Sequence, residues 1–498
     1  MQFLLLFSAF VVATCGLIYE LIAGTLASYL LGDSVTQFST IIGVYLFSMG
    51  IGSFLSKNFN KNLLGWFIQI ELLVGIVGGF SSVLLFVCFE YVESFRIILY
   101  FMISLTGILV GLEIPLLLRI LKDQMEFKDL VSKIFTVDYI GALLASIIFP
   151  LILVPYLGLV KTSLFFGILN VLVALWLILK LKSGKGYFNL LLMEALLILV
   201  VLAIGMIYAE GWVNSSEQAF YHDKVIYAKS SPYQRIVLTK NKDVIKLHLN
   251  GNLQFSSADE YRYHEALVHP GMSLLTKPEN ILVLGGGDGL AVRELLKYPE
   301  VKHIKLIDLD AQVTHLFKTH SLLTPLNQNS LSSPKLDVLN ADAYTWLRNS
   351  DEKFDFVCVD FPDPSNFSIG KLYSAAFYKE LKRVLKPNAV IVVQSTSPLV
   401  ARKTFWCVNH TLQYNGFYTK PYHVYVPSFG EWGYVMASPA PLIESYDLKV
   451  PCRFLDSSAL RTGFVFPKDM DSIATDVNKL NNQVLVHYFE EEWSNYIP

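Results

Sequence analysis

The stretch that decides the fold is Ile281-Leu282-Val283-Leu284-Gly285-Gly286-Gly287-Asp288-Gly289, a short apolar run that breaks into glycines. Further along the chain, a second apolar run ends in Asp360-Phe361-Pro362-Asp363-Pro364. A strand followed by a glycine loop and a helix, here from Leu290, places backbone against a ligand at the carboxyl edge of a parallel sheet. We therefore expect the chemistry of this protein at that edge.

Strands and helices alternate around these two runs. Strands are predicted at 281–284, 304–307, 336–339, 354–359 and 389–394. Helices are predicted at 290–297, 310–319, 341–348, 374–384 and 399–414. This order predicts a doubly wound parallel sheet, a Rossmann-like α/β domain of the methyltransferase type at 259–440, which a hairpin of 418–426 and 432–438 completes.

Two shorter segments flank this domain. A small β-rich module is predicted at 211–258, where short apolar or alternating runs surround the strong hairpin signal Asn250-Gly251. A helix that Pro270 ends is expected to open the domain itself. The tail, 441–498, is polar, and we expect it to pack against the domain.

The first 210 residues carry most of an apolar excess: 53% of the chain is hydrophobic, 16% is charged, and the mean hydropathy is +0.45. The excess falls in blocks long enough to cross a bilayer as helix. We predict a multi-pass transmembrane bundle in the cell membrane at 1–210, with about seven spans at 3–30, 38–56, 65–90, 96–120, 137–157, 162–180 and 187–208.

The remaining composition excludes other classes of protein. A net charge of −2 without a basic face argues against a nucleic-acid partner. The five cysteines have no paired or metal-like spacing, so neither disulfides nor a bound metal are expected.

Three acidic residues, Glu20, Glu113 and Asp138, fall within or beside the predicted spans. Because charge inside a bilayer is costly, such groups are functional candidates for binding a cation or polyamine. The alternative is structural: they pair with Arg119, Lys133 or hydroxyls to lock the bundle. Glycine-rich runs at 50–53 and 75–79 are expected to allow close helix packing.

The sidedness of the bundle is open at this stage. Loops after the second, fourth and sixth predicted spans hold nine basic residues, and the other loops hold two: Lys57, Lys61, Arg119, Lys122, Lys128, Lys133, Lys180, Lys182 and Lys185 against Arg96 and Lys161. That bias favours a cytoplasmic amino terminus, which with seven spans puts the soluble domain outside. A ligand made in the cytosol requires the opposite, and we place the soluble domain in the cytoplasm.

The glycine loop departs from the dinucleotide pattern, because Leu290 stands where a third glycine belongs. Asp288 inside the loop suits a ligand with a positive charge. Asp308, at the end of the second strand, can accept both ribose hydroxyls, and Asp342, after the third, can accept from the adenine amine. Three acids repel phosphate and suit an adenosyl sulfonium. The alternative reading is that each aspartate is a helix N-cap.

The ensemble of motifs resembles the spermidine synthases, the polyamine aminopropyltransferases, over about residues 224–440. The whole chain looks like the membrane-integrated bacterial branch of that family. The motifs that carry the resemblance are Tyr233-Gln234, Leu249-Asn250-Gly251, Gln254, Asp259-Glu260, Tyr263-His264-Glu265, Gly285 to Gly289, Arg293-Glu294, Asp342 and Asp360-x-x-Asp363-Pro364.

The resemblance implies transfer of an aminopropyl group from decarboxylated S-adenosylmethionine to putrescine, which gives spermidine and methylthioadenosine without a metal or other cofactor. It implies that Asp360 is the base, and that Asp363 and Tyr263 hold amines in the active site. The remaining matches are donor or nucleoside contacts, namely Gln234, Gly285, Gly287, Asp288, Asp308, Leu309, Asp342 and Ala343, and amine contacts, namely His264, Asp363 and Phe429. Soluble members form homodimers through this domain, and the same is expected here.

Three positions depart from the family pattern: Asn250 replaces the usual aspartate, Phe361-Pro362 replaces two serines, and Phe429 replaces an amine-contacting tyrosine. All three concern the acceptor end rather than the donor end. The alternatives are therefore another reaction on an S-adenosylmethionine-type donor, by methyl transfer or intramolecular cleavage, or a membrane polyamine or nucleoside transporter or sensor.

Overall fold

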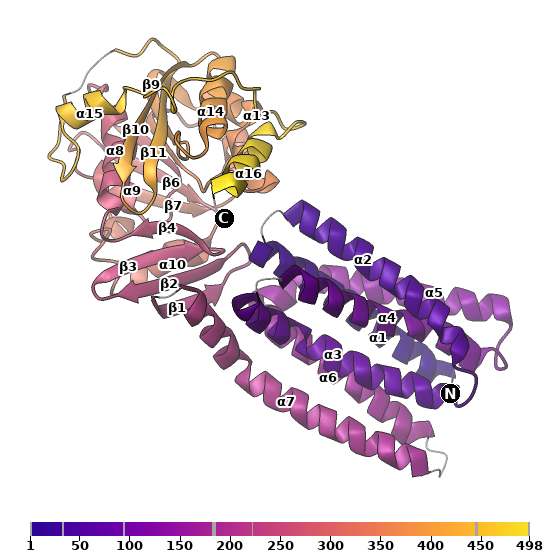
Figure 1. The fold of residues 1–498 in the computed structure, drawn as a ribbon. Coiled ribbons are helices and arrows are strands. Elements are labelled where there is room, and N and C mark those ends of the chain that lie inside the picture. Colours follow the sequence, from indigo (N-terminus) through magenta and orange to yellow (C-terminus); the bar gives the residue numbers. More distant parts are fainter. Residues whose placement is uncertain are drawn as a thin grey trace. The chain divides into compact units, whose positions relative to one another are not determined.

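The computed structural model describes residues 2–31, 34–92, 95–181, 186–221, 223–443 and 447–496. Its chain forms two compact units, Met1–Pro232 and Tyr233–Pro498 (Figure 1). Lys182 and Lys185, two of the basic loop residues counted above, lie outside the described residues.

The first unit is built of long apolar helices. They are α1 (Gln2–Leu31), α2 (Ser34–Leu55), α3 (Leu63–Tyr91), α4 (Phe95–Leu121), α5 (Phe127–Ile148), α6 (Val154–Leu181) and α7 (Gly186–Tyr221), followed by β1 (Lys224–Ser230). Six helical stretches of the described residues are long and apolar enough to cross a membrane. One of them, Phe127–Lys180, has 54 residues, more than twice the length that one crossing needs.

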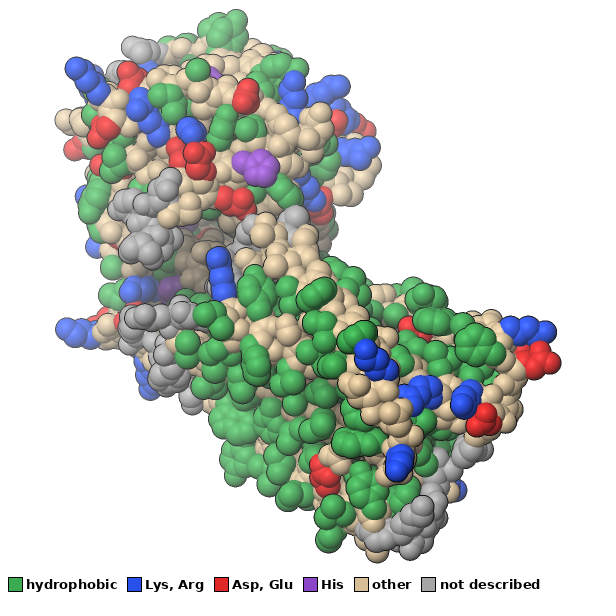
Figure 2. All heavy atoms as spheres, turned by 45° about the vertical axis from the view of Figure 1, so that its right-hand side comes forward, with side chains coloured by type: hydrophobic (Ala, Val, Ile, Leu, Met, Phe, Trp, Pro, Cys, Tyr) green, Lys and Arg blue, Asp and Glu red, His purple; other side chains and the backbone are tan. Residues whose placement is uncertain are grey.

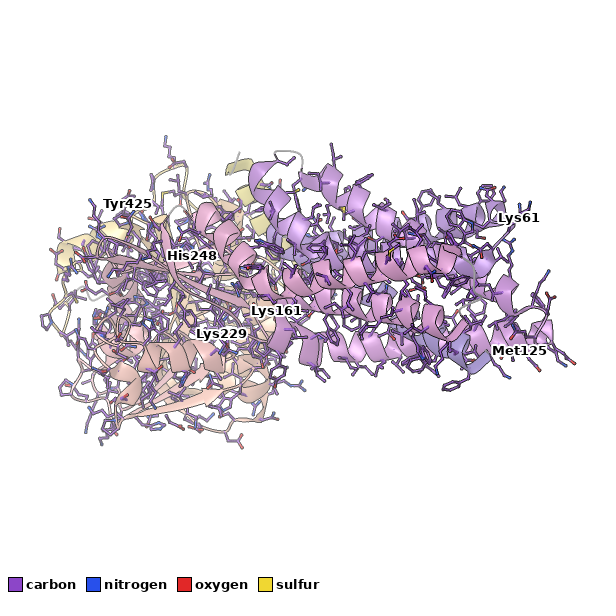
Figure 3. The ribbon with its side chains drawn as sticks, turned by 90° about the horizontal axis from the view of Figure 1, so that it is seen from below. Lys61, Met125, Lys161, Lys229, His248 and Tyr425 are labelled. Atoms are coloured by element: carbon purple, nitrogen blue, oxygen red, sulfur yellow. The ribbon has the colours of Figure 1, made fainter. Side chains whose placement is uncertain are left out.

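A kink divides this long stretch. A short π-helix, η2 (Phe149–Leu153), joins α5 to α6, and Gly158 has φ 71° and ψ 175°, a conformation that only glycine adopts readily. Lys61 and Met125 lie at one end of the bundle, whereas Lys161, just after the kink, lies toward the other end (Figure 3). The chain therefore reverses at Gly158, which is where the sequence analysis separated its fifth and sixth spans.

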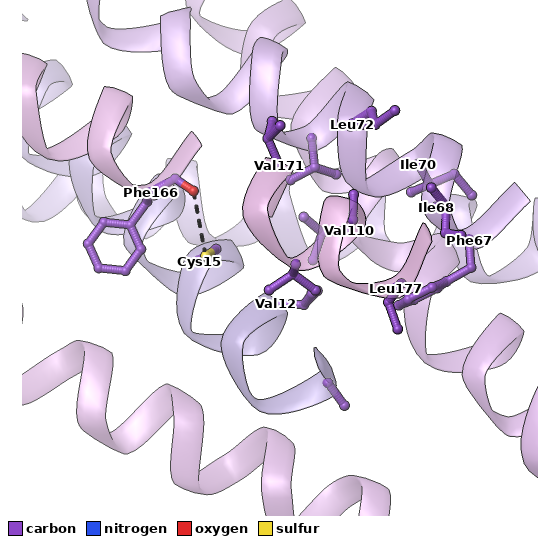
Figure 4. Close-up of a cluster of buried hydrophobic side chains, with 14 of the residues drawn as sticks. Val12, Cys15, Phe67, Ile68, Ile70, Leu72, Val110, Phe166, Val171 and Leu177 are labelled. Carbon is purple, nitrogen blue, oxygen red and sulfur yellow. Dashed lines mark hydrogen bonds between the residues drawn. The ribbon is translucent and has the colours of Figure 1, made fainter. Parts of the chain in front are cut away.

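Helices α1 and α3 lie inside the bundle and contact most of the others. Their buried faces form a continuous apolar core with α4 and α6, in which the Cys15 thiol approaches the carbonyl oxygen of Phe166 at 3.8 Å (Figure 4). The predicted close packing of helices at small residues is present. A Cβ added to Gly52 would lie 2.1 Å from the Ile108 carbonyl oxygen, and a Cβ added to Gly167 would lie 2.5 Å from the Gly75 carbonyl oxygen. Hydrophobic side chains also cover much of the bundle's outer surface (Figure 2).

Among the described residues, the hydrogen bonds of Arg119 go to backbone carbonyls. Arg119 donates to the backbone carbonyls of Ser56 and Phe59 at 2.9 and 2.6 Å, where α2 ends. These bonds give no support to Arg119 as the counterion of Glu20, Glu113 or Asp138, and pairing of these acids with Lys133 or hydroxyls stays a prediction.

The second unit begins with antiparallel strands β2 (Arg235–Asn241), β3 (Val244–Leu249) and β4 (Asn252–Ser256). The predicted Asn250-Gly251 turn joins β3 to β4, with φ of 50° and 83°. This left-handed pair is the conformation that makes Asn-Gly a hairpin signal.

A seven-stranded mixed sheet forms the centre of this unit, in the order β10-β11-β9-β8-β5-β6-β7. Its strands are β5 (Asn280–Gly285), β6 (His303–Asp308), β7 (Leu336–Asn340), β8 (Phe354–Asp360), β9 (Leu385–Gln394), β10 (Tyr418–Val426) and β11 (Gly430–Ser438). The first five are parallel and the last two form the predicted antiparallel hairpin. Two apolar clusters cover its faces, so the predicted Rossmann-like architecture is confirmed.

The helices that cover the sheet follow the prediction with shifted ends. They are α8 (Glu260–Ser273), α9 (Leu290–Leu295), α10 (Ala311–Thr319), α11 (Ala343–Asn349), α12 (Phe367–Gly370), α13 (Ala375–Arg383) and α14 (Arg402–Tyr414), with α15 (Ser457–Gly463) and α16 (Val484–Tyr496) in the tail. The prediction that Pro270 ends its helix is wrong, because α8 continues to Ser273. Two hydrogen bonds anchor the tail on α14. The Thr404 hydroxyl donates to the Glu492 carboxylate at 2.8 Å, and the Trp406 indole N–H donates to the Met470 carbonyl oxygen at 2.9 Å.

Candidate active site

The carboxyl ends of the parallel strands bring the predicted site residues to one edge of the sheet. Strand register pairs Gly285 of β5 with Asp360 of β8, and Asp308 of β6 with Asn340 of β7. The glycine loop therefore lies between Asp360 and Asp308 at one edge of the sheet, as expected for a doubly wound sheet.

The glycines of the loop have steric reasons to be glycine. Gly285, Gly286 and Gly289 have positive φ of 80°, 65° and 75°. A Cβ on Gly285 would lie 2.2 Å from the Asp360 carbonyl oxygen, and one on Gly287 2.6 Å from a carboxylate oxygen of Asp308. The loop thus needs glycine both for its turn and for its close approach to the two acids.

Asp308 is held rigidly against this loop. Its Oδ2 accepts from the Gly287 N–H at 3.0 Å and its Oδ1 from the Asp310 N–H at 2.8 Å. Burial raises its pKa to about 6, against the effect of these hydrogen bonds. Gln234 donates to Asp310 at 3.0 Å, so the predicted donor contact from the β module lies beside the same aspartates.

Of the other two predicted nucleoside carboxylates, Asp342 caps a helix and Asp288 accepts within its own turn. Asp342 caps α11 by accepting from the Thr345 N–H and hydroxyl, each at 2.8 Å, and pairs with Lys371 at 3.1 Å. Asp288 accepts from the Leu290 N–H at 2.9 Å. The capping alternative is therefore confirmed for Asp342 and wrong for Asp288 and Asp308, because Gly289 and Asp310 are the N-caps of α9 and α10. Each carboxylate keeps lone pairs for a ligand. Next to them, Leu309 is 44% exposed and Ala343 is buried.

Tyr263 and Asp360 form the shortest polar contact on this edge. The tyrosine hydroxyl on α8 donates to Asp360 Oδ1 at 2.5 Å. Burial, with a contribution from nearby Asp288, raises the pKa of Asp360 to about 6, although His264 and the Tyr263 hydrogen bond lower it. At neutral pH the group is a carboxylate that takes up a proton more readily than an ordinary aspartate.

Asp363 lies at the far side of the same loop. Gln394 donates to its Oδ1 at 3.3 Å and Thr396 to its Oδ2 at 3.3 Å. Burial raises the pKa of Asp363 to about 6, although these two donors lower it. Gln394 also donates to the Phe361 carbonyl at 2.6 Å, so one side chain fixes the whole Asp360–Asp363 turn.

Buried charged side chains form a network next to the site. Arg293 on α9 donates to both oxygens of Glu260 at 2.8 and 3.0 Å, and to Glu294 at 2.9 Å. Glu260 also contacts His264 Nδ1 at 2.9 Å. Burial lowers the pKa of His264, but Glu260 with Asp288 and Asp360 raises it to about 9. A charged imidazole therefore stands close to Asp360.

Aromatic rings surround the Tyr263 side chain. Ring centroids of Phe429, Trp432 and Tyr434 lie 6.2, 6.5 and 5.6 Å from that of Tyr263. Asp259 accepts from the N–H and hydroxyl of Ser428, which fixes the turn before Phe429. Aromatic faces next to carboxylates can bind an ammonium group.

Sequence reasoning missed Gln394, Thr396 and Trp432. Gln394 ends the predicted strand 389–394, so the rule that picked Asp308 and Asp360, the carboxyl ends of strands, also points to it. Trp432 begins the predicted segment 432–438, but whether it faces the site depends on hairpin register, which the sequence does not give. In the part of the chain that the structure describes, no group of three His, Cys, Asp or Glu side chains could hold a metal ion.

Comparison with known proteins identifies the family of this chain. Residues 260–447 match the family model of the spermine/spermidine synthase domain. The chain is 50% identical over its full length to the polyamine aminopropyltransferase of Leptospira interrogans, and covers all of it. It is 49% identical to polyamine aminopropyltransferase 2 of Ralstonia nicotianae, covering 98% of each chain. A solved spermidine synthase in complex with the transition-state analogue AdoDATO aligns with half of this chain and 88% of its own, at 24% identity and a TM-score of 0.47. The chain belongs to the polyamine aminopropyltransferase family.

Proposed function

We propose that this protein transfers the aminopropyl group of decarboxylated S-adenosylmethionine to putrescine, which yields spermidine and methylthioadenosine. The observation that carries the proposal is the 2.5 Å contact between Tyr263 and Asp360 beside the glycine loop. It supplies an oriented base at the point where an adenosyl ligand on Asp308 presents its sulfur.

The reaction needs little more than alignment and proton removal. The amine nitrogen attacks the aminopropyl methylene, the carbon–sulfur bond breaks, and its electron pair neutralises the sulfonium. The attacking amine loses its proton to Asp360, and Asp363 with Phe429 holds the rest of the acceptor. Because the sulfonium is already a good leaving group, no metal is required.

The donor site rests on the three rim aspartates. In the proposal, Asp308 accepts the ribose hydroxyls and Asp342 the adenine amine, between Leu309 and Ala343. Asp288 and Gln234 hold the aminopropyl and sulfonium end, and the backbone of Gly285 and Gly287 lies against the nucleoside. Aspartates disfavour a phosphorylated ligand and favour a cationic one.

Product analysis of the purified full-length protein tests the assignment. Decarboxylated donor with putrescine should release methylthioadenosine and spermidine in equal amounts, and Asp360→Asn should abolish both. Methylthioadenosine without spermidine rejects the acceptor. Turnover of intact S-adenosylmethionine instead supports the alternative of methyl transfer or cleavage. Nucleoside binding without any turnover favours a sensor or transporter. Chelation by EDTA should leave the rate unchanged.

We also propose that the helices of the first unit cross the cell membrane. Their length, mean hydropathies of 1.7 to 2.9 and exposed apolar surfaces support this. We place the catalytic unit in the cytoplasm, where its donor is made. The basic loops favour a cytoplasmic amino terminus, which with seven spans would put this unit on the other side of the membrane. Reporter fusions after Trp493 decide this: activity of a reporter that works only outside the cytosol rejects the placement.

A homodimer formed through the catalytic unit is proposed from the resemblance to soluble members. Mass measurement of the detergent-solubilised protein should give about twice the 56.2 kDa of one chain. A single-chain mass that keeps full activity rejects this assembly.

A further inference from the structure

We propose that the carboxyl-terminal tail holds the loop between β8 and α13 in place, and that Asn478 of the tail is a positioning residue for aminopropyl transfer. This loop comprises residues 361–374 and is called the β8–α13 loop below. We rest this inference on the proposed function, because the β8–α13 loop follows the proposed base, Asp360, and carries Asp363.

Asn478 binds the β8–α13 loop and the start of α13. It lies between α15 and α16 and is 0% exposed. Its side-chain amide donates to the Gly370 carbonyl oxygen at 3.0 Å, and its backbone carbonyl oxygen accepts from the Ala375 N–H at 2.8 Å. Between these two bonds lies η4 (Lys371–Tyr373), a short 3-10 helix. One buried tail residue therefore fixes the chain on both sides of η4.

The short helix η4 connects the two halves of the active site. Lys371 pairs with Asp342, the proposed adenine carboxylate, at 3.1 Å. The Tyr373 hydroxyl lies 3.2 and 3.1 Å from the carbonyl oxygens of Phe361 and Pro362, to which it donates, in the turn that carries the proposed acceptor aspartates. A displacement of η4 would therefore disturb a contact of the donor end and a contact of the acceptor end together.

The tail has its own attachments beside those to the loop. Asn478 donates its backbone N–H to the Thr411 hydroxyl of α14 at 3.0 Å, and its side-chain oxygen accepts from the Leu485 N–H of α16 at 3.4 Å. His410 Nδ1 and the Thr475 hydroxyl lie 2.8 Å apart, and α16 lies beside α14 (Figure 1). The Asn478 amide thus uses its oxygen within the tail and its NH2 group for the loop. This division lets the tail act as a fixed support for η4.

Gly370 shows how closely the tail fits the loop. Its φ of −55° and ψ of −30° are ordinary helical values, so its backbone conformation does not require glycine. A Cβ at this position would lie 2.4 Å from Cγ2 of Val486, a buried residue of α16. The ring of Phe367, in the same loop, also contacts that of His487, with centroids 5.8 Å apart. The close approach of α16 is therefore what requires glycine at this position.

Steady-state kinetics of the full-length protein in detergent test this role. Asn478→Asp keeps the oxygen that accepts from Leu485 and removes the donor to Gly370. We expect the KM of each substrate to rise by about 5-fold or more, the effect of losing a buried hydrogen bond. A tail that only stabilised the fold would lower the amount of active protein, and hence the apparent kcat, at constant KM. Thr475→Val is the matched control, because it breaks a bond of the tail to α14 rather than to the loop, and it should leave both KM values unchanged.

A second pair of variants tests the same contact if Asn478→Asp does not fold. Gly370→Ala forces α16 away from the loop and should raise both KM values in the same way. Adding Val486→Ala frees the space that the new methyl group needs. The double variant Gly370→Ala/Val486→Ala should therefore return both KM values to within about twofold of the wild type.

Trypsin cleavage reports on the loop without turnover. Lys371 lies in η4, and Lys318 is an exposed residue of α10 that serves as the reference. Cleavage after Lys371 should be at least about fivefold faster in Asn478→Asp than in the wild type, because a released loop opens locally, whereas cleavage after Lys318 should keep its rate.

Three results overturn the inference: unchanged KM values in both Asn478→Asp and Gly370→Ala, a Gly370→Ala defect that Val486→Ala does not relieve, and equal acceleration of both trypsin cuts. The last would indicate general destabilisation rather than release of η4. Absence of spermidine from wild-type reactions would reject the proposed function alone, since the trypsin measurement does not depend on turnover.

Discussion

The hydroxyl of Tyr263 donates to Asp360 Oδ1 at 2.5 Å, and this contact joins the first helix of the catalytic unit to the tip of its central strand β8. Tyr263 is itself fixed, because Tyr434 of β11 donates to its backbone carbonyl at 3.1 Å. The proposed base is therefore oriented by residues from elements that are far apart in the sequence.

Tyr263→Phe removes this donor with little change in shape. We expect kcat to fall by about 10- to 100-fold, the effect of losing a hydrogen bond to a charged group. The acid limb of the pH profile should also move to higher pH, because the hydrogen bond stabilises the carboxylate form of Asp360. Steady-state kinetics from pH 5 to 9 measure both effects. Tyr425→Phe, an exposed tyrosine on β10, is the control and should change neither.

Activity should fall as the pH drops through about 6. Burial raises the pKa of both Asp360 and Asp363 to about 6, and the reaction needs both as carboxylates. A logarithmic plot of kcat/KM for putrescine should therefore approach a slope of 2 on its acid side. In Asp363→Asn the slope should be 1 at a lower overall rate. A slope of 1 in the wild type would contradict the role of one carboxylate.

The same raised pKa values set the sign of a stability effect. The folded state favours the protonated acids, so their contribution is fully present below pH 4 and is lost as the pH rises through about 6. Asp363→Asn should thus raise the melting temperature of the ligand-free protein at pH 8 and leave it nearly unchanged at pH 4. Differential scanning calorimetry at both pH values checks this.

His264 controls the pKa of Asp360 through its charge. Because the imidazole is protonated up to about pH 9, it favours the Asp360 carboxylate. His264→Asn should move the acid limb up by about one unit, which corresponds to roughly 1.4 kcal/mol. His315→Asn, on the exposed side of α10, should leave the profile in place. An unshifted limb in His264→Asn would contradict a charged His264.

The sheet and its rim were predictable because they depend on local pattern. Alternating strands and helices with a glycine loop at Gly285 imply that Asp308 and Asp360 share an edge, whatever their distance in sequence. The partners that tune them were not predictable. Arg293 and Glu260 meet only in the folded unit, and nothing in their spacing tells an ion pair inside the protein from two surface charges.

The bundle shows the same limit. Hydropathy located the long apolar helices, and the charges of Glu20, Glu113 and Asp138 drew attention to these three residues. Glu71 was overlooked, although it lies within a predicted span and is more deeply buried than the other three. Which acid has a partner depends on the helix faces that meet, and composition alone does not fix those.

Gly287→Ala tests the close approach of the glycine loop to Asp308. The new Cβ would lie 2.6 Å from a carboxylate oxygen, so Asp308 must move away from the proposed ribose position. We expect the KM for the donor to rise by at least about 10-fold, the cost of a displaced buried hydrogen bond, with little change in the KM for putrescine. Gly50→Ala, which has no neighbour within 4 Å, is the control for the substitution itself. Equal changes in both KM values would point to general unfolding of the loop.

Thr396 combines backbone strain with a contact to the acceptor side of the site. Its φ is 59°, rare for a β-branched residue, yet it is buried, its carbonyl accepts from the Gly433 N–H at 2.7 Å and its hydroxyl donates to Asp363. Thr396→Gly removes the strain, which costs of order 1 to 3 kcal/mol, and also the hydroxyl. We therefore expect a melting temperature that is unchanged or higher, together with a several-fold higher KM for putrescine. Thr396→Ser keeps the hydroxyl and should keep the wild-type KM. If Thr396→Gly binds putrescine as well as Thr396→Ser does, the strained threonine has no part in holding Asp363.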